Sequence, residues 1–440
     1  MRDLITDAKR IYLETVRATD PQVLLEGLLN VTGDVLTVND ASIDLSRYRS
    51  IVLIGFGKAS LKMGAAVENA LGPRLTQGLL VTDRRSVTVK SEVIVAGHPL
   101  PDEDSLLAGK RIVDVVSASD EETLLIFLIS GGGSALVECL SSTELTLEDL
   151  QALNRVIVHC GASIREVNTV RKRLSRIKGG GLRRFIRGSK VVALYLSDVN
   201  SSDLATIASG PLLEDAAGDD DLLSVIEKYA LLDRLPVRVA RTLAEGLRRS
   251  SGTHVGKAVD AIHVLVGDNL TAVKSATAIA ETLGFRVETE TEQVEGDYRV
   301  AADRLIDRMI ALGDRSAGED VCLISGGEVA CAVVGKGVGG RNQEFVVYSA
   351  ERLTKLGRNR AAAVLSGGTD GIDGNSCAAA AATGTDMLQS AEARGMDVRR
   401  FIEKNNSHSF LKAVGGLVFT GPTGTNIRDI RVFLAGKGEP

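Results

Sequence analysis

Three segments of this 440-residue chain carry the sequence Ser-Gly-Gly directly after an apolar run. They begin at Ser130, Ser325 and Ser366. Consecutive glycines let an anion approach the backbone N–H groups without meeting a side chain, and the N-terminus of a following helix adds partial positive charge. The three segments therefore predict sites for phosphate or carboxylate groups, although a glycine can also serve only to close a tight turn.

Lys58 follows Gly57 just after another apolar run, at 51–54, where a helical pattern begins. A lysine in that position is well placed as a point charge on a phosphate. The segment is not a P-loop, because Val52 stands where that motif needs glycine. It is not a GxGxxG dinucleotide motif either, because Ser60 stands at the last position. The alternative for Lys58 is a solvated lysine at a helix start, which the helix dipole mildly disfavours.

The densest glycine run of the chain, at 335–340, leads into Arg341 and an apolar helical pattern. Such a loop can wrap closely around a polyphosphate, and the guanidinium fork of arginine matches phosphoryl oxygens in a bidentate way. We therefore predict that Arg341 contacts a transferring phosphoryl group. The alternative is a flexible hairpin tip with incidental charge.

Three carboxylates, Asp198, Asp370 and Asp373, stand at or just after the ends of predicted strands. Carboxylates there could hold Mg²⁺, which binds through one or two carboxylates together with phosphate oxygens, or could accept a proton from an attacking hydroxyl. Aspartate is also favoured in turns and at helix N-termini, which leaves a structural role open for each of the three.

Six basic residues between 165 and 178 precede the glycines at 179–181. Cations in a last helical turn before glycine form an ordinary C-terminal cap, which explains only part of this cluster. One or two of these cations could reach an acidic substrate. Of the five histidines, His98 in the sequence Gly-His-Pro is the most suggestive, because the proline fixes a turn there, but a structural role is favoured for it.

The elements that must position these residues alternate between strands and helices. Strongly apolar runs lie at 51–54, 124–129, 191–196, 262–266, 321–324 and 361–365. Strands this apolar are typical of sheets covered on both faces, which favours an α/β fold with largely parallel or mixed sheets sandwiched by helices. Because parallel strands deliver their carboxyl ends to one edge of a sheet, the candidate residues are expected to gather there.

Two domains are expected, since a single core rarely grows beyond about 250–300 residues. A turn-rich segment at 250–256 lacks periodic hydrophobic residues. We place the boundary near it, which gives a Rossmann-like domain over 1–245 and a second α/β domain over 246–440, whose last residues could return to the first. The chain opens with an amphipathic helix, because apolar residues repeat at helical spacing over 4–16.

Composition excludes several classes of protein. The net charge of −5, with 6 tyrosines, 9 phenylalanines and no tryptophan, argues against a nucleic-acid-binding protein. No apolar run approaches the roughly 18 residues of a membrane helix, and the acidic residues of the first helix are foreign to a signal peptide. The five cysteines form no CxxC pair. We expect a cytoplasmic protein that binds neither nucleic acid nor membrane.

Motifs along nearly the whole chain, from about residue 4 to 434, resemble those of the glycerate 2-kinase family. They are GFGKA at 55–59, GHPLPDE at 97–103, SGGGSA at 130–135, KGGGL at 178–182, LSDV at 196–199, IASGP at 207–211, GRNQE at 340–344, GTDGIDG at 368–374 and TGPTGTN at 420–426. The chain departs from the family pattern after Gly374, where Asn-Ser-Cys replaces Pro-Thr-Asp. It also departs after Val199, where Asn-Ser-Ser-Asp replaces Pro-Gly-Asp-Asp.

The resemblance implies ATP- and Mg²⁺-dependent phosphorylation of the small molecule D-glycerate to 2-phosphoglycerate. It also implies a MOFRL-type domain at about 318–434 and an active site in the cleft between two α/β domains. Lys58 and Arg341 match the residues that stabilise the transferring phosphoryl group. To these we add Asp198 as a candidate base or metal ligand and Asp370 and Asp373 as candidate metal ligands. The expected substrate- and nucleotide-binding residues are Gly57, Ser130, Gly131, Gly132, Gly133, Ser134, Lys178, Gly326, Gly327, Gly339, Gly340, Asn342, Glu344, Gly368, Thr369 and Asp370.

Two other functions stay open. An NAD(P)H-dependent hydroxypyruvate reductase would use the same carboxylate handle, but it should show GxGxxG after 51–54 and an acidic residue about 20 positions further on. A non-catalytic sensor of a phosphorylated acid would bind without turnover and would need fewer charged groups. A homo-oligomer is compatible with the sequence.

Overall fold

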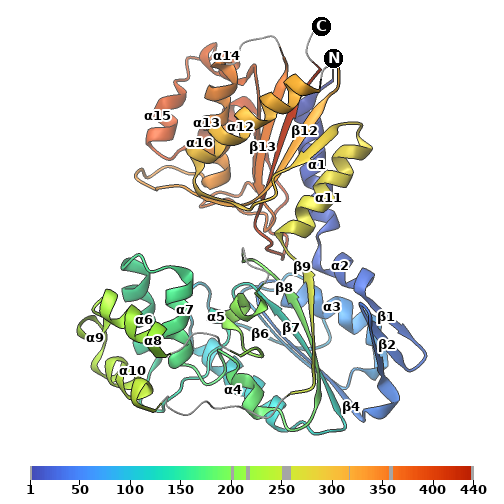
Figure 1. The fold of residues 1–440 in the computed structure, drawn as a ribbon, viewed down its shortest axis with the longest axis vertical. Coiled ribbons are helices and arrows are strands. Elements are labelled where there is room, and N and C mark those ends of the chain that lie inside the picture. The colour runs from blue at the N-terminus through green and yellow to red at the C-terminus, as the bar shows by residue number, and fades with distance from the viewer. Residues whose placement is uncertain are drawn as a thin grey trace. The chain divides into compact units, whose positions relative to one another are not determined.

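The structure, a computed structural model, describes residues 2–199, 203–214, 219–249, 259–316, 318–355 and 360–437. The chain forms two compact units, both drawn in Figure 1. The first unit is Leu24–Val266, and the second unit joins Met1–Val23 to Gly267–Pro440. Each unit contains a central β-sheet with flanking helices, which confirms the predicted two-domain α/β fold.

A six-stranded sheet forms the centre of the first unit, in the order β6-β5-β4-β7-β8-β9. Its strands are β4 (Ser50–Phe56), β5 (Gln77–Thr82), β6 (Glu92–Val95), β7 (Thr123–Ser130), β8 (Lys190–Leu196) and β9 (Ala261–Gly267). The pairs β4–β5, β4–β7, β5–β6 and β7–β8 are parallel. This is the 3-2-1-4-5-6 order of a doubly wound Rossmann sheet. The direction of strand addition reverses between β4 and β7, so the loops after these strands meet at the topological switch point.

The apolar runs of the sequence become strands that are buried on both faces. All eight residues of β7 are buried, as are six of the seven in β4 and in β8. The core contains Ile54 of β4, Phe127 of β7 and Ile112 of α4 (Glu103–Ser117). Asp102 begins α4 by a capping box with Ser105, which satisfies backbone N–H groups at the helix start.

The rest of the first unit is mostly helical. It contains α3 (Ser60–Leu71), α5 (Gly133–Leu136), α6 (Leu147–His159), α7 (Ile164–Arg173), α8 (Asp219–Lys228), α9 (Leu231–Arg234) and α10 (Val237–Arg249). Helix α2 (Pro21–Leu28) spans the boundary between the units at 23/24. Helices α6 to α10 surround an apolar core of their own, with Leu153, Leu222 and Val239. An antiparallel sheet is formed by β1 (Leu29–Thr32), β2 (Val35–Val38) and β3 (Ala41–Asp44).

The sheet of the second unit is mixed, in the order β10-β12-β16-β13-β14-β15, with β11 also paired to β12. Its strands are β10 (Arg286–Thr289), β11 (Val294–Asp297), β12 (Val321–Ala330), β13 (Ala362–Gly368), β14 (Ala380–Gly384), β15 (Leu417–Val418) and β16 (Asp429–Ala435). Strand β16, near the end of the chain, lies between β12 and β13 and is antiparallel to both. The helices are α11 (Asn269–Thr282), α12 (Tyr298–Arg315), α13 (Arg341–Lys355), α14 (Met387–Glu392), α15 (Val398–Glu403) and α16 (Ser407–Val414).

The opening helix α1 (Leu4–Ala18) belongs to the second unit rather than the first. Its apolar face is buried, and the hydroxyl of the fully buried Tyr12 donates to the carbonyl of Gly368 at 2.6 Å. The units thus differ from the predicted division at 245/246: β9 extends the first unit to Val266, and the last strand completes the second unit instead of returning to the first. Among the described residues, none of the helices has the length and apolar character needed to cross a lipid bilayer.

Candidate functional site

The loops after β4 and β7 are tied together at the switch point of the first sheet. The amide of Lys58 donates to the carbonyl of Gly131 at 2.9 Å, and the amide of Ala59 donates to the hydroxyl of Ser130 at 3.1 Å. Gly57 has a φ of +125°, and a Cβ there would overlap Ser130. Glycine is therefore required at 57. Lys58 lies directly against the Ser-Gly-Gly loop, two residues before α3 begins at Ser60.

Two further side chains lie around this loop. A Cβ on Gly131 would overlap the carboxylate of Asp198, and a Cβ on Gly132 would lie 3.2 Å from the His98 ring and 3.3 Å from Cγ of Lys58. Loss of solvent and the charge of Lys58 lower the pKa of His98, which favours the neutral imidazole. The structure therefore places Lys58 and Asp198 around the same loop, and it adds His98, which the sequence singles out among the histidines but for which it favours a structural role.

The other end of the loop joins a polar network. The hydroxyls of Ser134 and Ser209 lie 2.7 Å apart, and the Ser209 hydroxyl donates to Asn168 at 3.2 Å. Lys178, expected to bind a ligand, is instead buried in an ion pair with the buried Glu138. A buried cation needs an anionic partner, and Glu138 fills that need. The burial of Lys178 is therefore explained without a role in substrate binding.

The other two Ser-Gly-Gly segments do not lie in loops. They lie within strands, in the middle of β12 and at the end of β13, and Gly326 and Gly367 both pair with Ile430 of β16. A Cβ on Gly326 would overlap Asn269, and a Cβ on Gly367 would lie 2.6 Å from the ring of Tyr12. These glycines therefore make room for neighbouring side chains. The sequence predicted loops at these two positions, but both segments are paired strands because β16 lies antiparallel between β12 and β13.

The backbone amides near these glycines are bound within the protein. The amide of Gly327 donates to Asn269 at 2.7 Å, and those of Gly368 and Thr369 donate to the carbonyls of Ala379 and Arg428, both at 3.0 Å. These contacts favour a structural role over the expected anion-binding role for the four residues concerned, Gly326, Gly327, Gly368 and Thr369.

The glycine run before α13 is anchored rather than a flexible tip. The amides of Val334 and Gly335 both donate to the side chain of Asn405 at 2.8 Å, and the amide of Gly339 donates to Asn375 at 2.9 Å. A Cβ on Gly340 would overlap Asp373. The loop is thus held by side chains of other segments and delivers Arg341 to a fixed position.

Asp373 caps helix α13. Its carboxylate accepts the amides of Asn342 at 3.1 Å and Gln343 at 2.9 Å, together with the side-chain amide of Gln343 at 2.9 Å. Asn342 in turn accepts the hydroxyl of Ser366 at 2.5 Å. The contacts of Asp373 and Asn342 are thus those of a buried helix N-terminus.

Arg341, the first residue of α13, is held by two carboxylates. Its Nε and Nη2 donate to Asp429 at 2.8 and 2.9 Å, and its Nη1 lies 3.0 Å from Glu328. Burial alone would raise the pKa of Asp429, but the hydrogen bonds and charge of Arg341 outweigh it and keep that pKa low. Arg431 is fully buried nearby and donates to the carbonyl of Gly326 at 3.1 Å.

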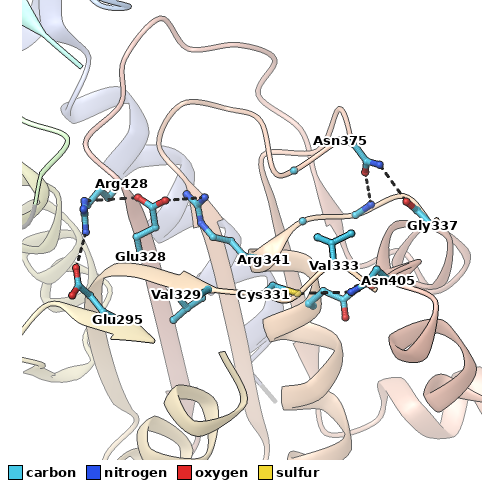
Figure 2. Close-up of a pocket in the computed structure, with 15 residues that line it drawn as sticks. Glu295, Glu328, Val329, Cys331, Val333, Gly337, Arg341, Asn375, Asn405 and Arg428 are labelled. Carbon is cyan, nitrogen blue, oxygen red and sulfur yellow. Dashed lines mark hydrogen bonds and ion pairs between the residues drawn. The ribbon is translucent and has the colours of Figure 1, made fainter. Parts of the chain in front are cut away.

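Arg341 lines a cavity of about 740 Å³ in the second unit. Figure 2 shows Arg341, Glu328, Arg428 and Glu295 at one end of this cavity, and Val329, Cys331 and Val333 along a more apolar wall. The remaining lining residues are Ala330, Gly337, Gly339, Gly340, Glu344, Gly374, Asn375 and Asn405. Glu295, Glu328 and Arg428 were not among the predicted site residues. Only the position of Glu328 directly after Ser325-Gly326-Gly327 could have indicated a site residue.

Glu344 lines the same cavity one helical turn after Arg341. The side chain is buried, and neither carboxylate oxygen has a hydrogen-bond partner among the described residues. Burial raises the pKa of Glu344 to about 7, against the lowering effect of Ser407 and of the charge of Arg299. Glu344 is therefore poised to change charge near neutral pH.

Magnesium is the metal that the motifs imply, so we asked which residues fit it. Within the described ranges, no group of three or more His, Cys, Asp or Glu side chains is arranged to hold a metal ion. Asp373 is engaged as a helix cap and fits poorly. Asp198 and Asp370 are only partly buried, and each fits a nucleotide-bound Mg²⁺, which needs one or two protein carboxylates.

Two protein families match the chain. Residues 7–244 match a domain described as a domain of unknown function, DUF4147, and residues 321–429 match the MOFRL family. The second match agrees with the range predicted from the motifs.

Individual proteins match over almost the full length. A glycerate 2-kinase of Pyrococcus horikoshii is 33% identical, over 97% of this chain and 96% of that protein. A putative hydroxypyruvate reductase of Agrobacterium vitis is 36% identical, over 88% and 99%. The crystal structure of a glycerate kinase from Thermotoga maritima has a TM-score of 0.84 and 32% identity, over 98% of this chain and 99% of that one.

Proposed function

Because this chain belongs to the glycerate kinase family, we propose that it transfers the γ-phosphoryl group of ATP to the C2 hydroxyl of D-glycerate, giving 2-phosphoglycerate and ADP. The observation that carries the proposal is the position of Lys58 at the switch point of the first sheet, against the Ser130 loop, whose Gly131 the Asp198 carboxylate also approaches. Ligands of doubly wound sheets bind at that point.

The proposed chemistry is an in-line displacement. The C2 oxygen attacks the γ-phosphorus, the bond between that phosphorus and the bridging oxygen breaks, and ADP leaves. Placement and charge stabilisation supply most of the acceleration in such a transfer. In this proposal Lys58 and Arg341 stabilise the negative charge of the transferring group. The segment Ser130–Ser134, with Gly57, accommodates the substrate carboxylate or a phosphate.

Mg²⁺ is proposed as the metal, with Asp198 and Asp370 as its candidate protein ligands. When bound, the ion would neutralise charge on the phosphate oxygens. Asp198 is alternatively the base that accepts the proton of the C2 hydroxyl. A site in the interdomain cleft, a homo-oligomer and a cytoplasmic location stay predictions.

A second candidate function is the reduction of hydroxypyruvate. The name of the Agrobacterium vitis relative and the strand order of the first sheet favour it, since that order also supports dinucleotide binding. The turn after β4 argues against a reductase. It reads Gly-Phe-Gly-Lys-Ala-Ser and lacks the third glycine of the dinucleotide motif.

Two assays on the same purified protein separate these functions. The kinase predicts ADP formation that requires both ATP and D-glycerate, with no oxidation of NADH by hydroxypyruvate. The reductase predicts the reverse pattern. ADP formation without D-glycerate would indicate only an ATPase and would contradict the proposed acceptor.

A further inference from the structure

Glu328 lies between two arginines on the wall of the second unit's cavity (Figure 2). One carboxylate oxygen is 3.0 Å from Nη1 of Arg341, and the other is 3.8 Å from Nε of Arg428. Nη1 of Arg428 lies 3.4 Å from Glu295. Two guanidinium groups therefore converge on one carboxylate at the surface of a cavity that is large enough for a small-molecule ligand.

The two carboxylates that hold Arg341 are not equivalent. Asp429 is fully buried and makes the bidentate pair with Nε and Nη2 of Arg341. Glu328 pairs only with Nη1, and 37% of its side chain is exposed. Asp429 thus fixes the orientation of the guanidinium from within the sheet, whereas Glu328 covers the edge that faces the cavity.

The Arg341–Glu328 pair is also expected to be weaker than the Arg341–Asp429 pair. A partly exposed ion pair contributes about 0–1 kcal/mol, so an incoming anion can replace Glu328 at little cost. Loss of a buried partner costs about 3–5 kcal/mol, so Asp429 stays in place. A phosphoryl group offers several charged oxygens and makes strong charge-assisted hydrogen bonds with arginine.

We propose that Arg341 and Arg428 form a binding site for a phosphoryl group, and that Glu328 occupies this site in the absence of ligand and leaves it when the phosphoryl group binds. The identity of the phosphoryl group rests on the proposed function: it is part of the polyphosphate of ATP or the phosphate of 2-phosphoglycerate. Glu328 then acts as an internal competitor. It keeps the two arginines from repelling each other, and it lowers the apparent affinity for any anion by the fraction of time it occupies the site.

Calorimetric titration of the full-length protein at fixed ionic strength tests the exchange. The probes are inorganic tripolyphosphate, ATP and 2-phosphoglycerate, each without D-glycerate so that binding is measured apart from turnover. Replacing the carboxylate in Glu328→Gln should tighten binding of at least one probe by up to about fivefold, because the competitor is lost while Arg341 stays bound to Asp429. Arg428→Met should weaken binding of the same probe.

Glu295→Gln is the matched control. It removes one negative charge from the same cavity, but Glu295 contacts only Arg428 of the pair and 59% of its side chain is exposed. We expect a gain well below that of Glu328→Gln. Equal gains in the two variants would mean that charge alone matters, and this would overturn the exchange. Unchanged or weaker binding in Glu328→Gln would overturn it as well.

The probe that responds identifies the source of the phosphoryl group. A response to ATP and tripolyphosphate assigns the site to the nucleotide polyphosphate, and a response to 2-phosphoglycerate alone assigns it to the phosphorylated acid; both support the exchange. The result is separable from the proposed function. If the wild-type protein failed to phosphorylate D-glycerate while Glu328→Gln still bound anions more tightly, only the proposed function would fail.

Discussion

Asp429 orients Arg341 through two parallel hydrogen bonds, of 2.8 Å from Nε and 2.9 Å from Nη2. Asp429 is the first residue of β16, where it pairs with Gly327 in the middle of β12 on one side and with Gly368 at the end of β13 on the other. The arginine that the sequence marks for a phosphoryl group is therefore fixed by a residue from near the end of the chain.

The first prediction concerns this pair. Asp429→Asn removes the charge that compensates Arg341 in a buried position, so the free energy of unfolding should fall by about 3 kcal/mol or more. Urea denaturation measures this change. The control Glu319→Gln breaks an exposed ion pair with Arg286 and should change stability by less than about 1 kcal/mol. Equal stability of wild type and Asp429→Asn would show that the pair is not important for the fold.

The second prediction concerns Lys58. Lys58→Met should lower kcat for D-glycerate phosphorylation by about 10³-fold or more, in the range found for other phosphoryl-stabilising cations. The fold should survive, because the contact between Lys58 and Gly131 is made by the backbone. Lys62→Met, in the first turn of α3, should keep kcat within a few-fold of wild type. Near-normal turnover in Lys58→Met would exclude Lys58 from the chemistry.

The third prediction tests the close approach of the Ser130 loop to Asp198. Gly131→Ala places a Cβ where the Asp198 carboxylate lies, so the two must move apart. A displacement of about 1 Å can cost about 100-fold in rate. Gly27→Ala is the control, since a Cβ at Gly27 meets nothing within 4 Å and alanine favours a helix. Steady-state kinetics compares the two variants, and equal activity would mean that the loop and Asp198 are not coupled.

The fourth prediction is a pH dependence of stability caused by Glu344. Its pKa is raised to about 7 in the folded protein, above its ordinary value of 4.5, because burial favours the neutral carboxyl. The stabilising contribution of the neutral form is complete below about pH 4.5 and is lost as the pH rises through 7, a change of about 3 kcal/mol.

Glu344→Gln keeps a neutral side chain of similar shape at every pH. The unfolding free energy of the variant, relative to wild type, should therefore increase by about 3 kcal/mol between pH 4.5 and 8. Urea denaturation at a series of pH values measures this difference. A difference that stays constant with pH would show that Glu344 ionises normally.

Local sequence patterns predicted the first half of the candidate site well. Apolar runs followed by glycine predicted parallel strands, and parallel strands bring Lys58, Ser130 and Asp198 to one edge of the sheet. The burial of Lys178 against Glu138 was not predictable in this way, because the two residues lie 40 positions apart and no repeat connects them.

The second half depends on contacts between distant segments. An amphipathic pattern predicts α1 as a helix but does not indicate that it packs against β13, where Gly367 makes room for Tyr12. Similarly, the apolar strand β16 gives no local signal that it lies at the centre of its sheet. Its insertion converts two expected loops into strands and places Asp429 and Arg428 beside Arg341 and Glu328.

The proposed reaction of this chain is the transfer of a phosphoryl group from ATP to the C2 hydroxyl of D-glycerate. The most direct test is a ³¹P NMR assignment of the product formed from ATP, Mg²⁺ and D-glycerate, with Lys58→Met run in parallel. We expect 2-phosphoglycerate and ADP in equal amounts from the wild type and little of either from the variant. Formation of 3-phosphoglycerate, or of no phosphorylated acid at all, would contradict the proposed reaction.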